Sequence, residues 1–231
     1  MKQSKIVCIG AIILIIGIVA FLAVELAVAM AWKMEPYNYF FNKISDLGAP
    51  DVGMIKNRFV NSPLHTVFNV ACMVLGAVFI FGFYCMNNYI KGPHKALSMI
   101  FLAIAGIGLT MIGVFPTSDH QGFTLHILFA GFAILGGSLA MITFGLSQMK
   151  VQMRKTGLCC VIFGVLNFVW TVLAKLSPNV GGMFERFAVY TIFAFGIVFS
   201  IFVLILYKKD TLLTKNSIPN TPTDSLISPA E

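Results

Sequence analysis

The chain has 231 residues, of which 58% are hydrophobic and 11% carry charge, and its mean hydropathy is +0.88. A soluble globular domain carries charge on about a quarter of its residues, so the composition excludes the soluble classes and predicts a protein surrounded by lipid. Membrane topology and attraction to anionic lipid account for the formal net charge of +7. Nucleic acid is therefore not expected as a partner.

Six apolar runs reach the length of about 20 residues that a helix needs to cross a bilayer. They lie at residues 6–32, 62–86, 96–115, 123–147, 157–175 and 186–207. The predicted fold is all-α: a polytopic membrane protein with a bundle of six transmembrane helices. Residues 1–207 form this domain, and the polar residues 208–231 form a tail that is expected to be disordered. The first run exceeds a signal-peptide core in length and contains Glu25, so we expect it to be retained as a helix.

Lysine and arginine predict the orientation, because they are enriched in cytoplasmic loops. The amino end, the second and fourth loops and the tail hold ten of these residues, whereas the first, third and fifth loops hold six. Both termini are therefore expected in the cytoplasm, in the cell membrane if the source is bacterial. The loop 33–61, with "ISDLGAPDVG" at 44–53, then lies on the outer side.

Polar residues gather toward this outer side. A helix rises about 1.5 Å per residue, which places the polar groups of several spans at similar depth, while the centre of each span stays apolar. Ionisable groups at this depth are costly and call for a common partner. The predicted ligand-binding residues are Asp46, Arg58, Asn61, His65, Asn69, Asp119, His126, Glu185 and Arg186.

Helical periodicity indicates which way these residues face, because residues at i, i+4, i+7 and i+11 share one side of a helix. The face of His65 contains Asn69, Cys72 and Gly76, and that of His126 contains Ala130, Ala133 and Gly137. Small residues mark the surfaces on which membrane helices pack, so both histidines are expected to face inward. Glu25 lies opposite an alanine stripe and its direction stays open. "NSP" at 61–63 predicts Ser62 as the N-cap of the second helix.

Four motifs lie spaced along the chain: "ISDLG" (44–48), "FVNSPLHTVFN" (59–69), "GVFPTSDHQGFTLH" (113–126) and "GGMFERF" (181–187). In this order they resemble the domain-of-unknown-function 998 family of integral membrane proteins. The resemblance extends to about residue 207. It implies a compact six-helix bundle whose motif residues cluster at one face, and it implies no activity. The matching positions are Asp46, Asn61, His65, Pro116, His126, Glu185 and Arg186.

The first functional hypothesis is a non-enzymatic binding or scaffold protein. Its outer polar cup would hold an anionic lipid headgroup or a partner membrane protein, using helix amino ends, Arg58 and Arg186. This hypothesis needs no cofactor. Membrane lipids are the expected partners.

The alternative is a membrane-embedded, metal-dependent hydrolase acting on a lipid. His65, His120, His126 and Asp46 could supply ligands to a divalent metal such as zinc. A haem held between His65 and His126 is a further redox hypothesis.

A third hypothesis is that the polar layer only locks the helices together. Asp46 would then pair with Arg58 or Arg186, and Glu185 with Lys175.

Overall fold

The computed structural model describes the chain except for residues 1, 56, 119–121, 152, 178 and 217–231. The helices are α1 (Lys2–Met30), α2 (His65–Met86), α3 (Lys95–Val114), α4 (Gly122–Lys150), α5 (Arg154–Leu176) and α6 (Gly181–Asn216). In the described part of the chain all six are long and apolar enough to cross a membrane. The protein is therefore an all-α, multi-pass membrane protein, as the composition predicts.

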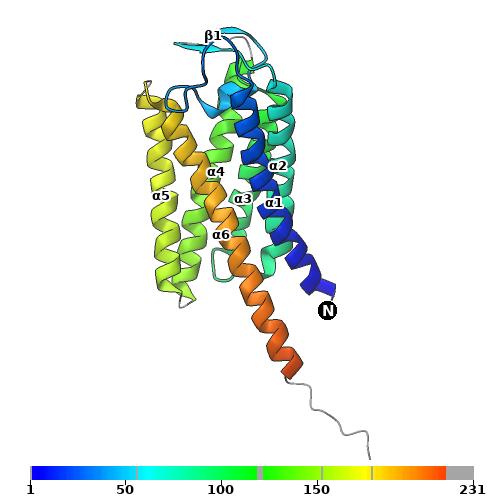
Figure 1. The fold of residues 1–231 in the computed structure, drawn as a ribbon. Coiled ribbons are helices and arrows are strands. Elements are labelled where there is room, and N and C mark those ends of the chain that lie inside the picture. Colours follow the sequence, from blue (N-terminus) through cyan, green and yellow to red (C-terminus); the bar gives the residue numbers. More distant parts are fainter. Residues whose placement is uncertain (1, 56, 119–121, 152, 178, 217–231) are drawn as a thin grey trace, which may run out of the picture.

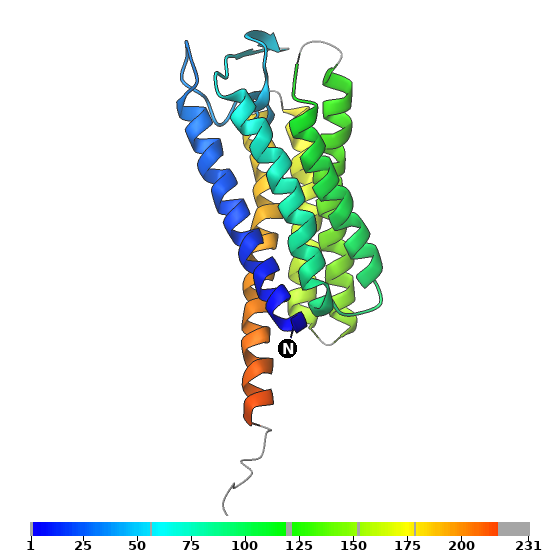
Figure 2. The ribbon, with the colours of Figure 1, turned by 90° about the vertical axis from the view of Figure 1, so that its right-hand side faces the viewer.

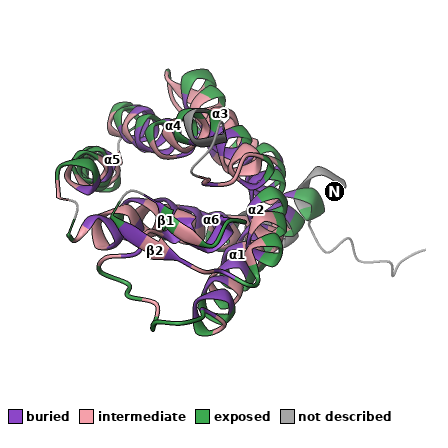
Figure 3. Ribbon diagram, turned by 90° about the horizontal axis from the view of Figure 1, so that it is seen from above, coloured by how far each residue is buried: buried purple, intermediate pink, exposed green. Residues whose placement is uncertain are grey.

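The helices run alternately up and down in one bundle, and short connections join helices that lie next to each other (Figure 1). Seen from above, α1 to α5 form an arc, and α6 lies between its two ends (Figure 3). Consecutive helices pack against one another along this arc, and α6 contacts α1, α4 and α5. The first and last helices are thus brought side by side, which places Glu25 next to Arg186.

Small residues allow the helices to approach closely. Gly76 on α2 faces Gly106 and Thr110 on α3, and Gly145 on α4 faces Gly157 on α5. Lipid is as apolar as leucine, so close van der Waals contact contributes more to helix association in a membrane than removal of apolar surface from water. The predicted inward faces are confirmed: Cys72, Gly76, Ala133 and Gly137 are all buried.

The connection between α1 and α2 covers one end of the bundle, and we call residues 31–64 the cap. It contains the 3₁₀ helix η1 (Ile44–Gly48) and an antiparallel hairpin of β1 (Gly53–Ile55) and β2 (Arg58–Val60), in which Gly53 pairs with Val60. Figure 2 shows the cap above the ends of α1 and α2. Within it, η1 contacts α1, α2 and α6.

The start of α2 differs from the predicted N-cap. The helix begins at His65, and Leu64 occupies the N-cap position without a side-chain hydrogen bond. The Ser62 hydroxyl instead donates a hydrogen bond of 2.7 Å to the carbonyl oxygen of Leu47. The prediction was wrong because a tertiary partner in η1 competes for that hydroxyl.

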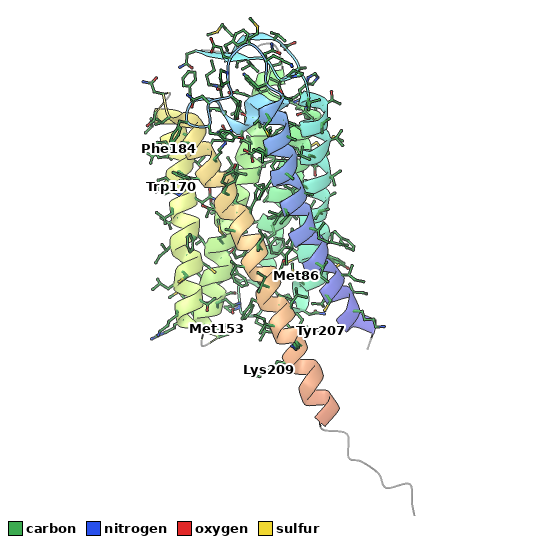
Figure 4. All side chains as sticks on the ribbon, viewed as in Figure 1. Met86, Met153, Trp170, Phe184, Tyr207 and Lys209 are labelled. Carbon is green, nitrogen blue, oxygen red and sulfur yellow. The ribbon has the colours of Figure 1, made fainter. Side chains whose placement is uncertain are left out.

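At the opposite end, α6 continues to Asn216, past the expected boundary at residue 207. Figure 4 shows Tyr207 near the level of Met153 and below Met86, and Lys209 on the part of α6 that extends below the other helices. Lys208 and Lys209 are exposed there. The rest of the predicted tail, residues 217–231, lies outside the described residues.

We expect Gly76→Ala to destabilise the protein by about 1–3 kcal/mol, the usual cost of overpacking. A Cβ at this position would overlap Thr110 Oγ1 and lie 2.5 Å from the carbonyl oxygen of Gly106. Gly131→Ala is the control, because a Cβ there meets nothing within 4 Å. The melting temperature of each variant is measured by thermal unfolding in detergent. Equal melting temperatures for the two variants would contradict the close α2–α3 contact.

Candidate functional site

A buried ion pair joins two parts of the cap, η1 and β2. Arg58 Nε donates to Asp46 Oδ2 at 2.7 Å, and Nη2 donates to Oδ1 at 2.9 Å. The backbone N–H of Lys43 adds a hydrogen bond of 2.8 Å to Oδ2. Asp46 is fully buried and Arg58 is 6% exposed. This two-bond geometry is among the strongest that side chains form, and it holds η1 against β2.

The environment of Arg58 keeps it charged. Burial lowers the pKa of the guanidinium, but the hydrogen bonds and negative charge of Asp46 raise it by more, with a smaller contribution from Glu185. The net effect is a pKa above the ordinary arginine value. The negative charge of Glu185 therefore acts on Arg58, while the hydrogen bonds of Arg58 go to Asp46.

A second buried arginine joins three parts of the chain. Arg186 Nε donates to Glu25 Oε1 on α1 at 3.3 Å. Its Nη1 donates to the cap carbonyl oxygens of Tyr39 and Asn42 at 2.9 and 2.8 Å, and to Gly182 at 3.2 Å. Its Nη2 donates to the Tyr37 hydroxyl. Arg186 thus connects α6 to α1 and to the cap.

Aromatic rings enclose this arginine. The Arg186 guanidinium carbon lies 5.2 Å from the Tyr37 ring centre and 4.8 Å from that of Tyr39, in cation–π range. Burial raises the pKa of Tyr37 well above its ordinary value. A neutral phenol can accept from Arg186 and also donate to the carbonyl oxygen of Lys43, at 2.7 Å. Tyr190, one turn after Arg186, donates to both carboxylate oxygens of Glu25 at 2.8 and 2.9 Å.

The polar residues near the start of α2 attach the cap to the bundle. Asn69 Nδ2 donates to the carbonyl oxygen of Gly48 at 2.9 Å. A Cβ at Gly48 would displace Asn69 Oδ1 at the end of its side chain, so glycine lets Asn69 approach the cap without a shift. Within the cap itself, the carbonyl oxygen of Asn61 accepts the Lys33 N–H at 3.3 Å.

Both predicted histidines face backbone carbonyls. His65 Nδ1 lies 3.0 Å from the Ser62 oxygen, and His126 Nδ1 lies 2.9 Å from the Phe115 oxygen. A carbonyl oxygen only accepts, so in each neutral ring Nδ1 carries the proton and Nε2 is an acceptor.

A small cavity lies beneath η1, between α1, α2, α3, α4 and α6, with a volume of about 60 Å³. Its walls are mostly Phe, Ile, Leu and Ala, and its polar lining residues are Ser45, His126 and Glu185, with Cys72. The structure therefore places both His126 and Glu185 in the lining of this space.

Two open grooves flank α6. The groove toward α1 has a volume of about 430 Å³ and is lined by Leu22, Glu25, Leu26, Tyr39, Tyr190, Phe193, Ala194 and Ile197. The groove toward α5 has a volume of about 490 Å³, and Trp170 lines it. Trp170 stacks on Phe184, at 5.8 Å between ring centres, near the capped end (Figure 4).

One predicted ion pair is present and another is not. The pairing of Asp46 with Arg58 is confirmed. Glu185 with Lys175 is wrong, because the ion pairs of the described residues are Asp46–Arg58 and Glu25–Arg186. Lys175 is exposed on α5, and α5 meets the bundle through Asn167 and Gly164 instead.

The metal-ligand prediction is only partly covered by the described residues. Among them, no group of three or more His, Cys, Asp or Glu is close enough to hold a metal ion. Asp119 and His120 lie outside the described residues, so the predicted set His65, His120, His126 and Asp46 stays a prediction.

Sequence reasoning left out Tyr37 and Tyr190 as partners of the buried charges. Tyr190 follows Arg186 by four residues and so shares its helix face, which was a usable signal. No pattern connects Tyr37 to residue 186. Glu25 faces inward, away from the exposed Ala23 and Ala27.

Comparison with known proteins gives one family. The model described as "Protein of unknown function (DUF998)" matches residues 15–201, from within α1 into α6. No curated protein and no solved structure matches the chain.

Removing Asp46 is expected to be costly, because it leaves Arg58 buried without its partner. We expect Asp46→Ala to lower stability by about 3–5 kcal/mol, as for other broken buried ion pairs. Asp51→Ala, at an exposed cap position, should stay within about 0.5 kcal/mol of the wild type. Thermal unfolding in detergent compares the two, and a mild effect of Asp46→Ala would show that the cap does not depend on the pair.

Proposed function

The chain belongs to the family described as protein of unknown function (DUF998), and we propose that it is a non-enzymatic lipid-binding protein. The proposed site is the groove between α1 and α6. One observation carries the proposal: this open groove has the exposed Leu26 beside the polar residues Glu25, Tyr39 and Tyr190 in its lining.

The lining suits an amphipathic ligand. Leu22, Leu26, Phe193 and Ile197 form an apolar surface for an acyl chain, and the polar residues lie toward the cap. A lipid reaches such a site by lateral diffusion within the bilayer, without passing through the cap.

The hydrogen-bond partners of the charged residues indicate which kind of lipid headgroup fits the groove. Arg58 and Arg186 donate their hydrogen bonds to internal partners, so the anionic headgroup of the sequence-based hypothesis has little support from them. Glu25 Oε2 accepts one hydrogen bond, from Tyr190, and a carboxylate oxygen has capacity for another. We therefore favour a headgroup that donates hydrogen bonds, through a hydroxyl or an ammonium. With cytoplasmic termini, as the loop charges favour, the headgroup would lie in the outer leaflet.

Ala194→Trp tests the proposal, because Ala194 is an exposed, small residue in the wall of this groove, which it shares with the groove toward α5. A bulky ring there should block the acyl chain and weaken lipid retention at least about tenfold, equivalent to about 1.4 kcal/mol. Lipid retained after mild delipidation is counted by native mass spectrometry. Val74→Trp, at a position on α2 that is 56% exposed, is the matched control and should retain lipid like the wild type. Equal retention by all three proteins would refute the groove as the site.

The metal-dependent hydrolase remains a second proposal, favoured by the histidine tautomers. Zinc-bound histidines usually donate their other ring N–H to a carbonyl or carboxylate, and the Nδ1 atoms of His65 and His126 both have such a partner. If this proposal is correct, purified protein carries near-stoichiometric metal, and His65→Ala and His126→Ala each lose it. Elemental mass spectrometry measures the metal bound per protein. If metal persists in both variants, His65 and His126 are not its ligands.

A further inference from the structure

The groove on the side of α6 that faces α5 has no role in the proposed function. Its volume of about 490 Å³ lies in the usual range of roughly 300–1,000 Å³ for small-molecule sites. The two helices meet at the capped end, where a Cβ at Gly181 would lie 2.9 Å from the carbonyl oxygen of Ala174. Figure 1 shows α6 tilting away from α5 toward the opposite end. The groove therefore lies between two helices that diverge with distance from the cap.

The walls of this groove suit an acyl chain. Phe163, Phe187 and Val198 line it and are exposed, so their apolar surfaces are available to a ligand. On α5 the lining extends from Thr156 to Trp170, which is about 20 Å along the helix axis at 1.5 Å per residue. One leaflet contributes half of the roughly 30 Å hydrocarbon core of a bilayer. An acyl chain can therefore contact the protein along its whole length.

The polar groups that a headgroup can reach lie at the end opposite the cap. Nearer the cap, the Thr191 hydroxyl donates to the carbonyl oxygen of Phe187 at 2.6 Å, and the Tyr190 hydroxyl donates to Glu25. Both hydroxyl protons are thus used within the protein. Thr156, in the first turn of α5, lines the groove and is exposed. A headgroup finds a hydrogen-bonding side chain at this end.

Positive charge lies at the same end of the groove. Arg154 and Lys155 begin α5, and both are exposed. Lys155 precedes Cys159 by four residues and so shares its face of the helix, and Cys159 lines the groove. Neither basic residue makes an ion pair with a described carboxylate. Basic side chains next to an apolar groove between membrane helices are complementary to an anionic lipid headgroup.

We propose that the groove between α5 and α6 binds one anionic glycerophospholipid, with an acyl chain along the groove and its phosphate beside Arg154, Lys155 and Thr156. With cytoplasmic termini, as the loop charges favour, this lipid belongs to the inner leaflet. The site is separate from the groove between α1 and α6 and does not depend on lipid binding there. The two grooves share Tyr190 and Ala194, so the test uses other residues.

The experiment counts lipid bound to the purified full-length protein by native mass spectrometry. Phosphatidylglycerol and phosphatidylcholine with the same acyl chains are added at equal concentration after delipidation. We expect the wild type to retain about tenfold more of the anionic lipid, because basic residues near the membrane surface attract it. Arg154→Gln combined with Lys155→Gln should remove this preference. Lys91→Gln combined with Lys95→Gln removes the same charge from the connection before α3 and should behave like the wild type.

Cys159→Trp tests the groove itself. Cys159 is an exposed, small residue that lines this groove and not the one between α1 and α6. A bulky ring there should block the acyl chain and lower the retention of phosphatidylglycerol about tenfold. Leu158→Trp is the matched control, because Leu158 is exposed on the same turn but does not line the groove. It should retain lipid like the wild type.

Other outcomes would overturn the proposal. Equal retention of the two lipids by the wild type would mean that charge does not select the ligand. A preference that persists without Arg154 and Lys155 would place the headgroup elsewhere. Full retention of phosphatidylglycerol by Cys159→Trp would show that the chain does not occupy the groove, and a second copy of the protein bound in place of lipid would make this face a subunit contact.

Discussion

The structure depends on Arg186. Its guanidinium joins α6 to Glu25 on α1 and donates to two carbonyl oxygens of the cap. It also makes cation–π contacts with the rings of Tyr37 and Tyr39. In a bilayer, removal of apolar surface from water does not drive helices together, so hydrogen bonds and close packing determine which helices meet. A charged side chain with this many internal partners can lie within a membrane helix, and it fixes the first and last helices side by side.

The cap follows from a second pair of the same kind. Asp46 and Arg58 are 12 residues apart, and their two hydrogen bonds hold η1 over the ends of α1, α2 and α6. Asn69 then attaches η1 to α2, and Ser62 bonds η1 to the segment that leads into α2. The arginines that would have formed an open, cationic cup are used to close it, and Glu25, Tyr39 and Tyr190 line the groove beside α6.

Neighbouring polar residues at the start of α6 face different parts of the bundle. Glu185 and Arg186 are adjacent in sequence, yet consecutive residues on a helix point about 100° apart, as 3.6 residues per turn requires. Arg186 is directed toward α1 and the tyrosines, whereas Glu185 lines the cavity with His126. Glu185 and Arg186 therefore face different sides of the first turns of α6.

The sequence by itself determined the membrane class, the six helices and the depth of the polar layer, because length, hydropathy and helical periodicity are local properties. It also placed Cys72, Gly76 and Ala133 on inward faces, and it offered Arg58 as a partner for Asp46. It could not decide that Arg186 pairs with Glu25, that Ser62 bonds η1 instead of capping α2, or that Lys175 stays exposed. Those outcomes depend on which helices become neighbours, and α1 meets α6 only when the arc closes. Partners 161 residues apart are selected by that closure, since only the tertiary structure brings a buried charge to its counter-charge.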